Sequence, residues 1–167
     1  MRILGIDPGY AIIGYGVLDY VGGRFHCAGY GAITTDADTP FSKRLVEIDD
    51  SLEKLLTAAG PDAVSLEKLY FVKNVTTGIA VAEARGLILM RAERHSVPVY
   101  EYTPMQVKQA VVGYGKAEKH QVMEMTRIML GLDEIPKPDD AADALAMAIC
   151  HGYSSESHLR GLDGKGI

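Results

Sequence analysis

Tryptophan is absent from this chain of 167 residues, and cysteine occurs only twice, as Cys27 and Cys150. Two cysteines without a CxxC pair exclude a disulfide framework, so we expect both to be small buried side chains in a reducing compartment. No apolar run reaches the length of about 18 residues that indicates a membrane-spanning helix. A basic, then apolar leader with a cleavage site is also missing, so we expect a cytoplasmic protein without membrane contact.

An excess of positive charge is lacking too, because the net charge is −5. The distribution of charge along the chain is uneven, however. Residues 68–137 carry ten Lys and Arg against seven Asp and Glu, whereas residues 1–67 carry five against ten. A local basic face binds phosphates whatever the total charge, so the composition does not exclude a nucleic-acid partner.

The order of the predicted elements is that of an α/β protein. Strands are predicted near 2–7, 12–19, 24–34, 62–66 and 97–102, and helices near 40–59, 74–94, 104–112, 117–130 and 138–151. The first long helix shows apolar residues at alternating spacings of four and three, which is one apolar stripe. We expect a single domain over residues 1–151 and a disordered, Gly- and Ser-rich tail over residues 152–167.

Asp7 is the most informative single residue, because it stands where the apolar run of the first strand stops. Pro8 and Gly9 then force a turn, and the chain returns as a second strand. A carboxylate at a strand end is held by the sheet and is directed beyond it, as a metal or phosphate site requires. The alternative is an ordinary Asx-turn, in which the Asp7 side chain only bonds its own backbone.

Further carboxylates occupy comparable places. Glu67 ends the predicted strand DAVSL, and the segment PDDAADALAMAI opens the last helix with Asp139, Asp140 and Asp143. Asp143 shares a helix face with Asp140 and also with Asp139, so spacing alone does not choose between those two. All three acids also suit a helix N-terminus, where the helix dipole stabilises negative charge. That explanation is weakest for Asp143, because Asp is a poor helix former within an alanine-rich packing segment.

A divalent cation resolves the repulsion that such a cluster would create. If the first and fourth strands are neighbours, their ends lie about 5 Å apart, and a helix start packed across them completes the cluster. Carboxylates this close raise each other's pKa. Oxygen ligands without a His and Cys set favour Mg²⁺ or Mn²⁺ over zinc, and two such ions about 4 Å apart form the site of many nucleases.

Several motifs together resemble the RuvC family of bacterial Holliday-junction resolvases. They are GIDPG at 5–9, GYGV at 14–17, LEKLYFVKN at 66–74, EARG at 83–86, QVKQAVVGYGKAEKHQV at 106–122 and DDAADALAMAICH at 139–151. The resemblance implies a ribonuclease H-like fold, which is a mixed central sheet flanked by helices on both faces. It also assigns the catalytic and metal-binding carboxylates to Asp7, Glu67, Asp140 and Asp143, and thereby chooses Asp140 over Asp139.

The same resemblance implies a function. Members form homodimers that bind a four-way junction and nick two opposed strands symmetrically, beside a branch-migration helicase complex, in DNA recombination and repair. Two Mg²⁺ ions per site are expected, with Mn²⁺ as a possible substitute, and Asp7 is the best candidate to bridge both because it is central and rigid. For DNA contact we expect Tyr70, Lys73, Lys108, Lys116 and Lys119; the alternatives are an aromatic packed under its loop and lysines on a solvated helix face.

Three other functions compete with this interpretation. GIDPG also resembles the first phosphate loop of actin-like and sugar-kinase ATPases, but those need two such domains and a later Asp-Gly-Gly turn, which this chain lacks. A ribonuclease H-like nuclease with another substrate remains open, as does a non-catalytic junction-binding module. For the dimer we expect an interface at residues 87–90, on a helix that is apolar nearly all round.

Overall fold

Five strands and five helices form the part of the chain that the structure, a computed structural model, describes: residues 1–68 and 75–159. In chain order they are β1 (Arg2–Asp7), β2 (Ile12–Val21), β3 (Arg24–Thr34), α1 (Phe41–Ala59), β4 (Ala63–Glu67), α2 (Val75–Arg94), β5 (Val99–Tyr102), α3 (Pro104–Val112), α4 (Lys119–Leu130) and α5 (Asp139–Leu159). No helix in these ranges combines the length and the apolar character that a membrane crossing requires.

The strands form one mixed sheet in the order β3-β2-β1-β4-β5. β1 to β3 are antiparallel, as their short connecting turns predict, whereas β4 lies parallel to β1 and β5 lies parallel to β4. Ile6 of β1 pairs with Leu66 of β4, so Asp7 and Glu67 follow a matched pair at the same edge of the sheet. The expected adjacency of the two strands is therefore confirmed.

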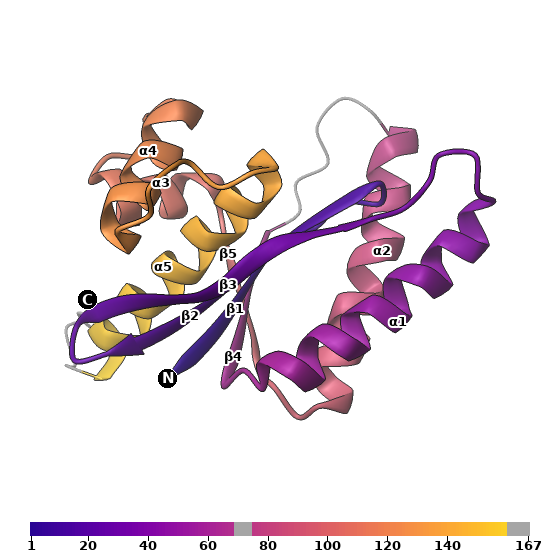
Figure 1. The fold of residues 1–167 in the computed structure, drawn as a ribbon, viewed down its shortest axis with the longest axis horizontal. Coiled ribbons are helices and arrows are strands. Elements are labelled where there is room, and N and C mark those ends of the chain that lie inside the picture. Colours follow the sequence, from indigo (N-terminus) through magenta and orange to yellow (C-terminus); the bar gives the residue numbers. More distant parts are fainter. Residues whose placement is uncertain (69–74, 160–167) are drawn as a thin grey trace, which may run out of the picture.

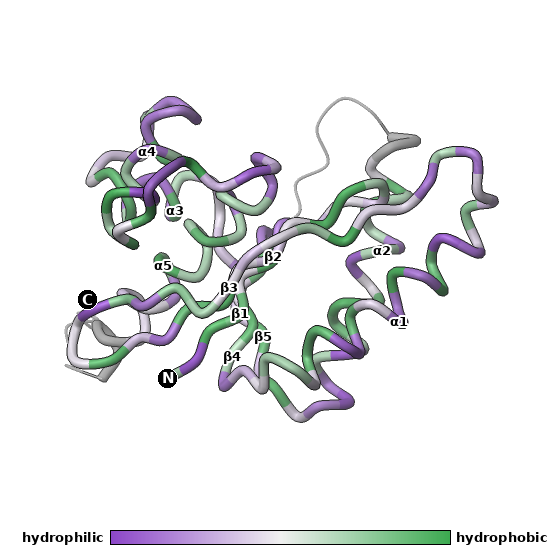
Figure 2. The backbone as a smooth tube through the Cα atoms, viewed as in Figure 1, coloured by the Kyte–Doolittle hydropathy of each residue, from purple (hydrophilic) through white to green (hydrophobic). Residues whose placement is uncertain are grey.

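Helices cover both faces of this sheet, with α1 and α2 on one face and α3, α4 and α5 on the other (Figure 1). Alternate residues of β1 divide between the two faces, since Leu4 and Ile6 belong to the core under α1 and α2 and Ile3 belongs to the core under α5. Figure 2 shows hydrophilic residues recurring along α1 between its apolar ones, as expected of a helix with one buried stripe.

α5 lies unusually close to the sheet because glycines stand beneath it. A Cβ atom added to Gly5 of β1 would overlap the carbonyl oxygen of Ala144, and one added to Gly14 of β2 would overlap that of Asp140. The helix presents alanines on its side of this contact, several of them fully buried. Ser65 of β4 adds a buried hydrogen bond, 2.7 Å long, from its hydroxyl to the carbonyl of Met147. The start of α5 is thus seated directly over the end of β1.

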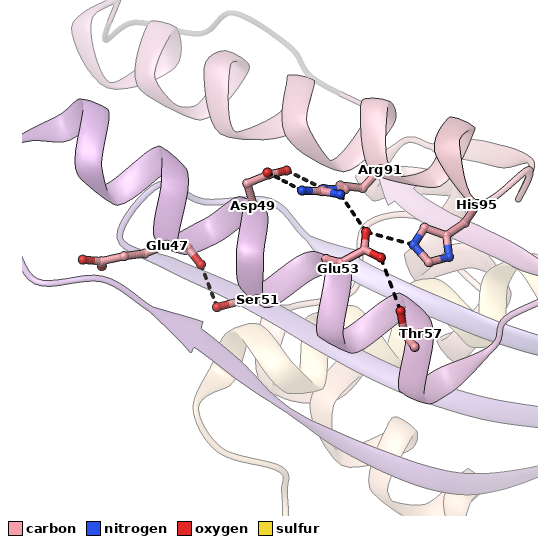
Figure 3. A network of polar contacts seen from close by, with 7 residues as sticks. All are labelled: Glu47, Asp49, Ser51, Glu53, Thr57, Arg91 and His95. Atoms are coloured by element: carbon pink, nitrogen blue, oxygen red, sulfur yellow. Dashed lines mark hydrogen bonds and ion pairs between the residues drawn. The ribbon is translucent and has the colours of Figure 1, made fainter.

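α1 and α2 are joined by a polar network on their outer side (Figure 3). Arg91 of α2 donates to both carboxylate oxygens of Asp49, and its Nη1 lies 2.7 Å from Glu53. His95 Nε2 lies 3.1 Å from the same Glu53 oxygen. Arg91 holds the pKa of Asp49 below its usual range, and His95 and then Arg91 do the same for Glu53. The network fixes the register of the two helices.

The expected interface at residues 87–90 divides between core and surface. Ile88 is 1% exposed and belongs to the core under α2, and Leu87 packs against that core. Leu89 and Met90 are 37% and 36% exposed, and Ile79 lies exposed on the same helix. The prediction is therefore wrong for Ile88, since a helix has only one side free once the other lies on the sheet.

The last helix is longer than expected. It continues past His151 to Leu159, so residues 152–159, which we expected within a disordered tail, are helical. Tyr153 explains the extension, because its ring packs edge-on against those of Phe25 and Tyr20 at 5.2 and 6.3 Å between centroids. The rest of the expected tail, residues 160–167, lies outside the described residues.

Candidate active site

Asp7 is the central carboxylate of the site. It is the last residue of β1 and pairs with Gly14 of β2, so sheet hydrogen bonds on its flank hold its backbone. Within the described residues its carboxylate accepts no hydrogen bond, which argues against the Asx-turn alternative. The side chain is half-buried and yet has no hydrogen-bond or ion-pair partner among the described residues, an arrangement that costs free energy unless a ligand compensates for it.

Glu67 ends β4 as Asp7 ends β1, and both side chains line one cleft of about 200 Å³. α5 contributes Asp143 from its first two turns, and residues of α3 and α4 complete the lining. The remaining lining residues are Pro104, Val107, Lys108, Lys119, Val122, Ala146 and Met147. Carboxylates and lysines together give the cleft both kinds of charge that a phosphodiester site with bound cations needs.

Asp140 completes the group without lining the cleft. Its backbone carbonyl stands against Gly14, the partner of Asp7 in the sheet, so the close seat of α5 carries Asp140 toward β1. Its charge reaches Asp7, whose pKa it helps to raise. The fold therefore brings Asp7, Glu67, Asp140 and Asp143 together, from residues as far apart as 7 and 143.

The carboxylates repel one another, and the repulsion raises the pKa of two of them. Burial, followed by the charges of Glu67, Asp143 and Asp140, raises the pKa of Asp7 to about 7. Burial and then Asp143 raise the pKa of Glu67 as well. At neutral pH the site is therefore short of positive charge, which a cation would supply.

Lys119 supplies part of that charge. Its Nζ lies 2.9 Å from Asp143 Oδ2 and 3.7 Å from Asp139 Oδ2, and its charge lowers the pKa of both Asp7 and Glu67. In return, the hydrogen bond to Asp143 raises the pKa of Lys119 more than any other interaction does. This lysine, which we expected to contact DNA, is thus also the counter-ion of the carboxylate cluster.

The other expected DNA contacts are placed unevenly. Lys108 of α3 lines the cleft and is half-buried. Lys116 is exposed on the turn before α4 and does not line the cleft. Tyr70 and Lys73 lie outside the described residues, so their expected roles stay predictions.

The residues suit a hard divalent cation by their chemistry. All four donors are carboxylates, and two of them have a raised pKa, which a bound cation would lower. Across residues 1–68 and 75–159, no three carboxylate, histidine or cysteine side chains already form an ion site. Asp143 is instead paired with Lys119.

The roles of two glycines and one aspartate that shape the site were not predicted from the sequence. Gly5 and Gly14 set the depth at which α5 sits, and their signal was glycine in the interior of strands, which indicates a close backbone approach. Asp139 entered only as a competitor of Asp140, whereas the structure places it against Lys119. That ion pair joins two helices across a loop, so no spacing along the sequence indicates it.

Comparison with known proteins agrees with this geometry. The family model described as crossover junction endodeoxyribonuclease RuvC matches residues 3–151. A protein of that name from Brevibacillus brevis is 57% identical, with 90% of this chain and 91% of the relative covered, and one from Ruminiclostridium cellulolyticum is 53% identical, with 92% and 93% covered.

Solved structures give the same result. The RuvC structure from Thermus thermophilus superposes with a TM-score of 0.88 at 35% identity, covering 95% of this chain and 97% of that one. The T. thermophilus protein in complex with a Holliday junction substrate gives a TM-score of 0.86 at 34% identity, covering 93% and 96%. The yeast mitochondrial resolvase Ydc2, at 15% identity and a TM-score of 0.67, shares the fold.

Proposed function

The chain belongs to the RuvC family of crossover junction endodeoxyribonucleases, and from that membership we propose that it resolves Holliday junctions by two symmetric nicks. Its fold is the ribonuclease H-like α/β fold of those resolvases. The substrate is four-way junction DNA, and the reaction is hydrolysis of one phosphodiester bond in each of two opposed strands.

One observation carries the proposal. The ends of two parallel strands and the start of a helix bring four carboxylates together at a cleft that Lys108 and Lys119 also line. Burial, followed by the charges of the other three, raises the pKa of Asp7 to about 7. A site that served only to bind DNA would gain nothing from negative charge gathered beside phosphates.

Family membership implies dependence on a divalent cation, and we propose Mg²⁺, two per site, with Mn²⁺ able to replace it. Asp7 would hold both ions, whereas Glu67 and the pair Asp140 and Asp143 would each hold mainly one. The chemistry that bound cations supply is Lewis-acid activation of water and stabilisation of charge on the leaving 3′ oxygen. The chain's own part is to hold the carboxylates rigidly together, two of them at strand ends and two at the start of α5.

Phosphate contact falls to the lysines in this proposal. Lys108 and Lys119 stand at the cleft, and Lys116 would extend the contact along the DNA backbone, with Tyr70 and Lys73 beyond the strand that ends at Glu67. A homodimer would supply two equivalent sites for the two nicks. A branch-migration helicase complex as a further partner and a cytoplasmic location complete the proposal.

The test is a cleavage assay with three labelled substrates: a four-way junction, a linear duplex and an RNA–DNA hybrid, each with and without Mg²⁺. We expect Mg²⁺-dependent paired nicks in the junction alone. Asp7→Asn should abolish the nicks and leave junction binding intact or tighter, since one negative charge near the phosphates is lost. Cleavage of the hybrid instead, or nicking by Asp7→Asn, would contradict the proposal.

A further inference from the structure

Lys119 stands at an unfavourable place in its own helix. It is the first residue of α4, where the helix dipole presents partial positive charge and disfavours a cation. Its position is explained instead by the start of α5, which presents Asp143 at 2.9 Å and Asp139 at 3.7 Å. The ammonium therefore lies between the N-termini of two helices and is held by carboxylates of the second.

The two carboxylates differ in their other neighbours. Asp143 lines the cleft with Asp7 and Glu67 and raises the pKa of both, so it belongs to the carboxylate cluster. Asp139 does not line the cleft and is 58% exposed at its side chain. Because residues 139 and 143 are four apart, they project from one face of α5, one turn from each other. Lys119 spans that turn.

An entering cation must compete with Lys119 for Asp143. The ion pair that now satisfies Asp143 has to break, and the freed ammonium would then stand beside a divalent charge. A second carboxylate one turn away offers the ammonium a place without moving α4. That second carboxylate is Asp139, already within the range of an ion pair.

We propose that Asp139 is a positioning residue: when a divalent cation binds Asp143, Asp139 becomes the ion-pair partner of Lys119. The inference rests on the proposed function, since it needs a cation at the cluster. Lys119 would then exchange partners along one turn of α5 and remain at the rim of the cleft. Asp139 acts through Lys119 alone and is not itself a ligand.

A double-mutant cycle read by Mn²⁺ binding to the DNA-free protein tests this, with free Mn²⁺ followed by electron paramagnetic resonance. Asp139→Asn should weaken Mn²⁺ binding by about two- to fivefold, the range of an exposed ion pair. Lys119→Met should tighten it, because the competing cation is gone. In the Lys119→Met background, Asp139→Asn should weaken binding no more than Glu134→Gln does in the wild type.

The controls separate the possible failures. Glu134→Gln removes the same charge from the segment before α5, where Glu134 forms no ion pair with any described residue, and Asp139→Glu should restore wild-type binding. Equal weakening by Asp139→Asn with and without Lys119 would show direct electrostatics and overturn the inference. Unchanged binding in Asp139→Asn would overturn it too. Wild-type protein that binds Mn²⁺ no better than Asp7→Asn would instead refute the metal site, and the inference with it.

Discussion

Asp7 combines burial with three neighbouring carboxylates, and this combination makes the site sensitive to pH. The pKa of Asp7 is about 7 in the folded, cation-free chain, against a value of 3.8 for an ordinary Asp. Between these pH values the folded state holds a proton that the unfolded state has released. The folded state therefore loses stability as the pH rises through this window.

We predict that Asp7→Asn removes most of this loss. In the wild type without divalent cations, the contribution of Asp7 should fall by a few kcal/mol at most between about pH 4 and pH 7, since one pKa unit corresponds to about 1.4 kcal/mol. Urea unfolding of both proteins in EDTA across that window measures the difference. Parallel curves for wild type and variant would show that Asp7 is not strained by its neighbours.

Lys108 differs from Lys119 in having no ion pair with the described carboxylates, so its charge is available to a phosphate. We predict that Lys108→Ala weakens junction binding and lowers the slope of log K against log salt by about 1. Fluorescence anisotropy over a salt series measures both. Lys54→Ala, on the exposed side of α1 across the sheet, is the matched control and should leave the slope unchanged. An unchanged slope in Lys108→Ala would place this lysine outside the DNA contact.

At the scale of elements, the seat of α5 decides whether the carboxylates meet. The helix crosses β1 and β2 where Gly5 and Gly14 leave no side chain, and Asp140 stands on that contact. On the other face of the sheet, the hydrogen bonds of Arg91 with Asp49 and Glu53 hold α2 against α1 (Figure 3).

We predict that Gly5→Ala lowers the free energy of unfolding by at least about 2 kcal/mol, because its new methyl group meets the backbone of Ala144 and forces α5 outward. Cleavage should fall further than stability explains, since the helix carries Asp143. Gly29→Ala is the control in the same sheet: nothing lies within 4 Å of its added Cβ, and its stability should change by less than about 0.5 kcal/mol. Equal losses of unfolding free energy in Gly5→Ala and Gly29→Ala would contradict the close packing of α5 on β1.

At the scale of the whole molecule, two nicks require two sites. α2 covers one face of the sheet and leaves the apolar side chains of Ile79, Leu89 and Met90 exposed, which suits contact with the proposed partner subunit. The site itself lies on the opposite side of the strands, among α3, α4 and α5 (Figure 1).

We predict that Leu89→Glu yields a folded monomer that binds a junction poorly and fails to make paired nicks, because it places an unpaired charge in the interface. Ile88→Glu should instead unfold the chain, since Ile88 is 1% exposed. Circular dichroism with sedimentation distinguishes these outcomes. Val46→Glu, at an exposed apolar residue of α1, is the control and should remain dimeric. A wild-type monomer on junction DNA would contradict symmetric nicking by a dimer.

The amino-acid sequence alone predicted most of the strands and helices and the carboxylates of the candidate site. Short turns predicted the antiparallel β1 to β3, spacings of three and four predicted the helices, and the strand-end positions of Asp7 and Glu67 indicated a common edge, because these signals are local. The same local signals failed at α5 beyond His151, where contacts of Tyr153 with distant aromatic rings extend a helix through a stretch that composition marks as a tail.

Only the tertiary structure decided how the charges are shared. Spacing along the sequence left Asp139 and Asp140 equivalent. In the fold, packing against Gly14 brings Asp140 toward Asp7, whereas Asp139 forms an ion pair with Lys119 of α4. The raised pKa of Asp7 likewise comes from burial in the fold and then from three carboxylates of two other elements. Coulomb energies and desolvation depend on distance and burial in space, and a sequence records neither of these for residues that are many turns apart.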